Sequence, residues 1–202
     1  MKTSTIAQSM EDGPRMAPPL DDVRVFERIY DEHVDFVWRS ARRLGIDEAA
    51  ADDVVQRVFL VVHRRLKEFE GRSSMKTWLF SILLHTIRDH RRALRRKSPH
   101  LLSEPSDPDA IADTCVAHNP EEALERAEAS RIIDALLDTL EEEKRIVFVM
   151  AELEQMTAIE IGQATGLDPK AVYSRLRAAR TDFERAASKL RRRTSEMGNT
   201  GE

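Results

Sequence analysis

Apolar residues recur every three or four positions through most of this 202-residue chain, and this spacing restricts its fold more than any other feature. Such a period places apolar side chains on one face of an α-helix, whereas the alternation typical of a strand is not visible. The seven glycines and the aromatic content of 5% also favour helices over an all-β fold. The sequence therefore predicts an all-α protein.

Three amphipathic stretches follow a polar N-terminal tail, 1–20, for which disorder is expected. Gly45 is placed to end the first stretch in a left-handed conformation, and Asp47 is a suitable N-cap for the second. The third stretch begins near Met75 and runs into a basic end. Short connections between three helices predict a compact bundle over residues 21–97.

The helical pattern stops at residues 98–118, where three prolines and several acids occur without periodicity. This composition predicts an acidic flexible linker. Helical signals return at Asn119, a cap residue that precedes a proline and two glutamates. The expected architecture is two small helical domains, 21–97 and 119–193, joined by that linker and followed by a C-terminal tail at 194–202.

The segment from Met156 to Arg180 carries the most specific local pattern. It combines a capping box, a small residue, a turn glycine and a second N-cap, supplied by Thr157 with Glu160, Gly162, Gly166 and Asp168. We expect Gly162 to let a second helix cross closely. Two short helices, a glycine turn and a basic outer face predict a helix-turn-helix that binds DNA. The residues expected to face DNA are Lys170, Tyr173, Ser174, Arg175, Arg177 and Arg180.

Basic residues form two clusters, which the net charge of −4 conceals. Residues 88–97 hold six basic residues and one acid, and residues 170–193 hold nine basic residues and two acids. Between them, residues 98–128 hold eight acids and one base. Crowding like charges at one helix end costs repulsion, so an anionic partner is expected; ordinary solvated helix faces are the alternative.

Aromatic residues precede the first basic cluster, at Phe69, Trp78 and Phe80. A positive track beside aromatic faces is typical of proteins that hold unstacked single strands. Core packing is the simpler interpretation for each aromatic residue taken singly, and burial is expected for Trp78. The polar loop at residues 70–74 has the composition of a loop that can receive an extruded base.

Two segments resemble bacterial sigma factors of the extracytoplasmic-function (ECF) type. The first is DDVVQRVFLVVHRRLKEFEGRSSMKTWLFSIL, residues 52–83, which with the arginine-rich helix end after it resembles their second conserved region. The second is LDTLEEEKRIVFVMAELEQMTAIEIGQATGLDPKAVYSRLRAAR, residues 137–180, which resembles their fourth region. Both occur in the family's order with a linker between them.

The resemblance implies a dissociable subunit that gives bacterial RNA polymerase its promoter specificity. The helix that holds Asp53, Gln56 and Phe59 would dock on the clamp of the largest core subunit. The helix-turn-helix would read the −35 element, and its domain would rest on the flap of the second-largest subunit. The residues implied to melt and read the −10 element are Phe69, Arg72, Ser73, Ser74, Met75, His85, Arg88, Arg91 and Arg92.

Four positions depart from the family's usual pattern. Arg57 stands where an acid is usual, and His63 stands where an aromatic residue is common. His85 occupies a place often held by asparagine at the −10 base pocket, and Ala178 replaces a frequent basic residue of the recognition helix. The promoter sequence therefore cannot be taken from relatives.

Two other classes of protein are weighed against this interpretation. A self-sufficient helix-turn-helix repressor would explain residues 156–180 but would leave the basic helix and the acidic linker without a role. A metalloenzyme would need more ligands than His85 and Asp89, which lie one turn apart. We therefore expect no catalytic site, no metal and no cofactor.

The expected partners are core RNA polymerase, promoter DNA and an anti-sigma factor. The lone Cys115 cannot form an internal disulfide, which fits a reducing cytoplasm. No signal peptide and no run long enough to span a membrane is visible, so no membrane insertion is expected.

Overall fold

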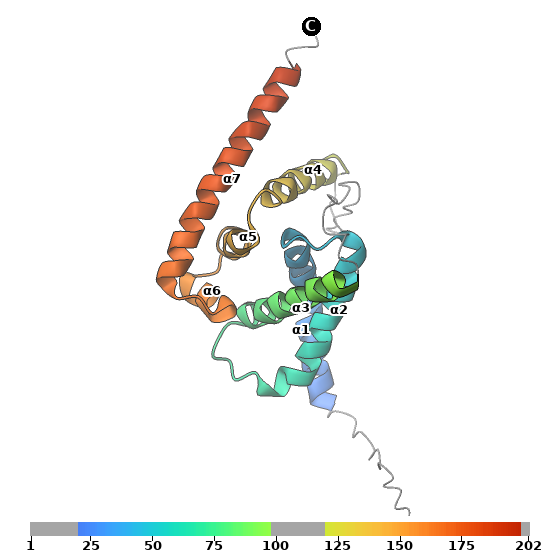
Figure 1. Cartoon of the computed structure of the whole chain (residues 1–202). Coiled ribbons are helices and arrows are strands. Elements are labelled where there is room, and N and C mark those ends of the chain that lie inside the picture. Colours follow the sequence, from blue (N-terminus) through green and yellow to red (C-terminus); the bar gives the residue numbers. More distant parts are fainter. Residues whose placement is uncertain (1–19, 98–119, 199–202) are drawn as a thin grey trace, which may run out of the picture.

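The structure, a computed structural model, describes residues 20–97 and 120–198, and helices make up the regular elements of this part (Figure 1). In chain order the elements are α1 (Leu20–Arg43), α2 (Glu48–Arg65), η1 (Leu66–Glu68), α3 (Met75–Lys97), α4 (Pro120–Leu137), α5 (Glu142–Phe148), η2 (Val149–Leu153), α6 (Ala158–Thr165) and α7 (Pro169–Gly198). The prediction of an all-α fold is confirmed.

Some predicted segments fall at the edges of the described residues. The linker at 98–118, the N-cap at Asn119 and nearly all of the N-terminal tail lie outside them. The tail expected from residue 194 is wrong in part, because α7 continues to Gly198. Alanine, arginine and leucine, which are strong helix formers, dominate the stretch before that end and favour this extension.

Two local signals set the boundary between α1 and α2, as predicted. Gly45 has a φ of +84°, and its N–H donates to the carbonyl oxygen of Arg42 at 2.8 Å, so α1 ends in a left-handed turn. Asp47 accepts a hydrogen bond of 2.7 Å from the N–H of Ala50 and caps α2. The apolar faces of α1, α2 and α3 then pack together. Their fully buried side chains include Val37, Ala41, Val54, Val58, Val62, Leu79 and Leu83.

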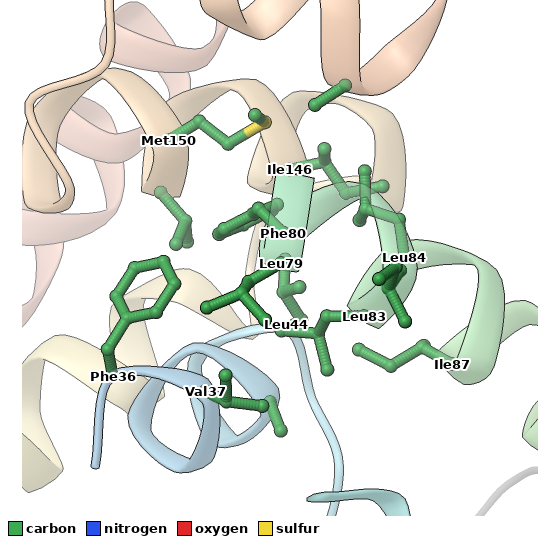
Figure 2. Close-up of a cluster of buried hydrophobic side chains, with 14 of the residues drawn as sticks. Phe36, Val37, Leu44, Leu79, Phe80, Leu83, Leu84, Ile87, Ile146 and Met150 are labelled. Carbon is green, nitrogen blue, oxygen red and sulfur yellow. The ribbon is translucent and has the colours of Figure 1, made fainter. Parts of the chain in front are cut away.

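A second face of α3 is also buried, and the sequence analysis anticipated this only for Phe80. Phe80 and Leu84 are only 0% and 2% exposed. Ile146 and Met150, from α5 and η2, belong to the same cluster of buried side chains (Figure 2). The two halves of the chain therefore share one continuous hydrophobic core.

Helices α6 and α7 form the predicted helix-turn-helix. Both bonds of the capping box are present, because Glu160 accepts from the N–H of Thr157 at 2.9 Å and donates its own N–H to the Thr157 hydroxyl at 3.3 Å. Gly166 turns the chain with a φ of +80°. Asp168 then caps α7 by accepting from the N–H of Ala171 at 3.0 Å.

The predicted role of Gly162 was wrong. A Cβ at this position would lie 2.7 Å from the carbonyl oxygen of Leu167. The glycine therefore makes room for the backbone of the turn that follows α6, rather than for a second helix that crosses it.

Candidate polymerase and nucleic-acid interfaces

A groove of about 700 Å³ runs between α1 and α2. Asp53, Gln56 and Phe59, the three residues expected to dock on core polymerase, all line it. The structure thus brings them to one surface. Phe59 is 3% exposed, so it forms the floor of the groove, whereas Asp53 and Gln56 are exposed.

Aromatic rings from both helices build this groove. Tyr30 packs edge-on against Phe59 with 4.7 Å between ring centroids, and Phe26 packs edge-on against His63 at 5.1 Å. His63 therefore contributes its ring to the aromatic wall of the groove. The sequence analysis missed that Tyr30 and Leu60 are 41% and 51% exposed, because a period in sequence does not reveal which apolar residues lie at the rim.

The residues expected at the −10 element gather at the start of α3 and along its basic end. Phe69 and Trp78 are half-buried, with their rings 4.9 Å apart. Trp78 is therefore not fully buried as expected, and Phe80 belongs to the core rather than to a strand-binding track. Ser73 and Met75 are half-buried. The other predicted residues are exposed: Arg72 and Ser74 before α3, and His85, Arg88 and Arg92 along it.

Arg91 differs from its neighbours on α3. Its guanidinium donates to the carbonyl oxygen of Leu44 at 2.6 Å and lies 2.5 Å from a carboxylate oxygen of Glu142. The side chain is 24% exposed. The expectation that Arg91 faces DNA is therefore not met in this conformation, because the guanidinium binds the second half of the chain.

A carboxylate from the helix-turn-helix also reaches the start of α3. The hydroxyls of Ser74 and Thr77 donate to Oε1 of Glu160 at 3.1 and 3.2 Å. The other oxygen, Oε2, accepts from the N–H and the hydroxyl of Thr157. These bonds, first the Thr157 N–H, then the Thr157 hydroxyl, and further those from Ser74 and Thr77, hold the pKa of Glu160 below its usual value.

The recognition helix presents most of its predicted residues to solvent. Lys170, Tyr173, Ser174 and Arg177 are exposed, Tyr173 by 65%. Arg175 is not fully exposed as expected, since this side chain is half-buried and pairs with Glu143 of α5 at 2.7 Å; its contact with DNA stays a prediction. Arg180 is exposed but donates to Glu152 of η2 at 2.8 Å. Two of the arginines expected to read DNA, Arg175 and Arg180, are therefore paired with carboxylates of this chain.

Within the residues that the structure describes, no three His, Cys, Asp or Glu side chains come together as metal ligands would. None of the helices in the described part is both long enough and apolar enough to cross a membrane.

Family profiles match both halves of the chain. The profile "Sigma-70 region 2" matches residues 29–97, and "Sigma-70, region 4" matches residues 130–183. The chain therefore belongs to the sigma-70 family of RNA polymerase sigma factors.

Similar proteins indicate which group of sigma factors this chain belongs to. The RNA polymerase sigma factor NccH of Alcaligenes xylosoxydans xylosoxydans is 30% identical over 160 residues, which cover 79% of this chain and 84% of NccH. The ECF RNA polymerase sigma-E factor of Escherichia coli K12 is 30% identical over 149 residues, 70% of this chain and 75% of that protein. The resemblance to ECF sigma factors is thereby confirmed.

Two solved structures have the same fold. CnrH, in complex with the cytosolic domain of CnrY, aligns with a TM-score of 0.60 and 24% identity over 83% of this chain and 90% of CnrH. The sigma factor RpoE, in complex with the anti-sigma factor NepR from Bartonella quintana, aligns with a TM-score of 0.67 and 17% identity over 82% of this chain and 98% of RpoE.

The bonds to Glu160 predict how stability depends on pH. Because its folded-state pKa is depressed, the bonds contribute stability that is present above the usual value of 4.5 and is lost as the pH falls through the lower folded value. Glu160→Gln keeps the capping-box spacing but does not titrate. We expect this variant to lose less stability than wild type between about pH 5 and pH 3 in urea unfolding.

A matched variant, Glu184→Gln, removes an exposed carboxylate of α7 that makes none of these bonds. It should lose stability on acidification as wild type does. If Glu160→Gln also follows the wild-type profile, the carboxylate does not contribute to stability in the way described.

Proposed function

We propose that this sigma factor binds core RNA polymerase through the groove between α1 and α2, reads the −10 element with α3 and the loop before it, and reads the −35 element with α7. The observation that carries this proposal is the presence of two basic surfaces on different helices, in a chain that matches both sigma-70 regions. In this proposal, residues 21–97 and 119–193 act as the two DNA-reading units.

The −35 element is assigned to the first turns of α7. Lys170, Ser174 and Arg177 are exposed on α7, and Asp168 caps the start of this helix directly after the turn that follows α6. Lysine and arginine contact phosphates, and arginine can also donate two bonds to one guanine in the major groove. Arg175 and Arg180 would contact DNA only after leaving Glu143 and Glu152.

The −10 element is assigned to the other basic surface. Arg88 and Arg92 would follow the backbone of a displaced strand, and the paired rings of Phe69 and Trp78 would stack on an unpaired base. The polar loop before α3, which contains Arg72, would receive a base taken out of the duplex. These roles require DNA that is melted, which is the state an initiating polymerase needs.

Core polymerase is assigned to the groove between α1 and α2. Tyr30 and Leu60 offer exposed apolar surface there, and Asp53 and Gln56 add a polar rim. An apolar centre within a polar rim is typical of a protein–protein interface. An anti-sigma factor is proposed as a second partner, since both solved relatives with this fold are described in complex with a second protein.

Run-off transcription tests the proposal as a whole. We expect purified core polymerase and this chain together to produce transcripts from a subset of a promoter-fragment pool, whereas neither component alone does so. A self-sufficient repressor would instead bind duplex DNA tightly and specifically without polymerase, and would give no transcripts.

Arg177→Ala should weaken the use of particular −35 sequences in the same assay. A lost bidentate contact with guanine lowers discrimination by about 1–3 kcal/mol, which is roughly 5- to 150-fold. The effect should be confined to one or two −35 positions and should persist on templates already melted at −10. Arg64→Ala, which removes an exposed arginine of α2, is the control and should transcribe as wild type. Equal loss on every −35 sequence would assign Arg177 to a phosphate instead.

Leu60→Asp should reduce association with core polymerase by tenfold or more. The side chain is 51% exposed, so the change puts a charge into the groove without opening a cavity in the core. Ile132→Asp makes the same chemical change at a residue of α4 that is 43% exposed, and it should bind core as wild type. Co-purification of Leu60→Asp with core at wild-type levels would show that another surface docks.

A further inference from the structure

We propose that Glu143 and Glu152 are positioning residues that hold two arginines of α7 away from the DNA backbone. Their pairs with Arg175 and Arg180 keep the sequence-independent binding of duplex DNA weak. Engagement of a −35 element then depends mainly on the base contacts of α7. This inference rests on the proposed assignment of α7 to the −35 element.

The cations in the first turns of α7 fall on two kinds of face. Successive residues of an α-helix are about 100° apart around its axis. Lys170 and Arg177 therefore lie within about 20° of each other, and both are exposed on the outer face, opposite the fully buried Val172. Arg175 and Arg180 lie about 140° and 80° away from Lys170 in opposite directions. They stand on the two sides of the outer face.

The pairing of these cations follows the same division. Arg175 lies 2.7 Å from a carboxylate oxygen of Glu143. Two guanidinium nitrogens of Arg180 lie 2.8 and 2.6 Å from one carboxylate oxygen of Glu152. Among the residues that the structure describes, no carboxylate pairs with either cation of the outer face. The carboxylates thus neutralise the sides of this face and not its centre.

Tertiary packing sets the position of both carboxylates. Neither pair forms within α7, because Glu143 belongs to α5 and Glu152 to η2, which continues α5. Helix α5 packs beside α7 (Figure 1), and the rings of Phe148 and Phe183 stack between them with 4.6 Å between centroids. The two pairs are therefore a property of the folded helix-turn-helix domain rather than of one helix surface.

The exposure of the pairs makes them restraints that DNA can overcome. Arg175 is 29% exposed and Glu143 is 72% exposed, whereas Arg180 is 56% exposed and Glu152 is 34% exposed. One member of each pair is thus partly withdrawn from water, and the other is open to it. Exposed ion pairs of this kind shift an equilibrium by no more than about fivefold. Each carboxylate therefore competes with DNA without blocking it.

The groups that these arginines would meet on DNA are phosphates. A helix in the major groove presents its outer face to the base edges, and its sides face the two phosphate strands. A carboxylate and a phosphate compete for the same guanidinium, because both are anionic acceptors. A phosphate contact adds affinity that does not depend on sequence and that falls as salt rises. Holding back Arg175 and Arg180 therefore lowers binding to every duplex and leaves base reading to the outer face.

Fluorescence anisotropy with a labelled duplex that lacks promoter elements tests this proposal. The full chain would be titrated at several salt concentrations. Glu143→Gln and Glu152→Gln should each raise the affinity at low salt by about two- to fivefold, because each releases one arginine to a phosphate. Each should also steepen the slope of log K against log salt by up to about 0.9, and the double variant should show both effects.

The effect should pass through the arginines. When Arg175→Ala is already present, Glu143→Gln should have no further effect, and the same holds for Glu152→Gln when Arg180→Ala is present. Glu184→Gln removes an exposed carboxylate of α7 that pairs with neither arginine, and it is the control for net charge. Circular dichroism reports whether each variant folds. If Glu152→Gln unfolds, Glu143→Gln decides, because it changes an exposed side chain.

An unchanged affinity and salt slope in the folded single variants would overturn the proposal. So would a rise that persists when the paired arginine is absent, since the carboxylate would then repel DNA directly. A fall in affinity would also overturn it, because the carboxylate would then orient its arginine toward DNA. Failure of run-off transcription together with the expected anisotropy pattern would count against the −35 assignment alone.

Discussion

Helix α3 is apolar on two faces, and the rest of the structure depends on covering both. Helices α1 and α2 cover the first face, and the second half of the chain covers Phe80 and Leu84 on the other. The far end of α3, with Arg88 and Arg92, remains in water. One helix can therefore carry a core segment at its front and a polycation at its back, because its two ends lie in different surroundings.

The helix-turn-helix combines two roles through a single carboxylate. Glu160 closes the capping box of α6 and also accepts from Ser74 and Thr77 at the start of α3. The residue that starts the DNA-reading motif thus also joins it to the other half. Arg43 at the end of α1 and Glu154 after η2 also join the halves, through an ion pair of 2.8 Å.

Features that depend on neighbours in sequence were predictable. The left-handed turn at Gly45, the cap at Asp47 and the capping box of α6 follow from residue type and spacing alone. Features that depend on distant partners were not. From the sequence, Arg91 and Arg175 were expected to be available to DNA. Each instead pairs with a glutamate of α5, and no local sequence pattern connects the two partners. The exposed rim of the groove was missed for the same reason.

Differential scanning calorimetry of the full chain tests most directly whether the two halves share one core. The account predicts a single transition in wild type, with equal calorimetric and van't Hoff enthalpies, because neither half can lose its packing alone. Glu154→Arg should divide it into two transitions. A wild-type chain that already melts in two independent steps would contradict the account.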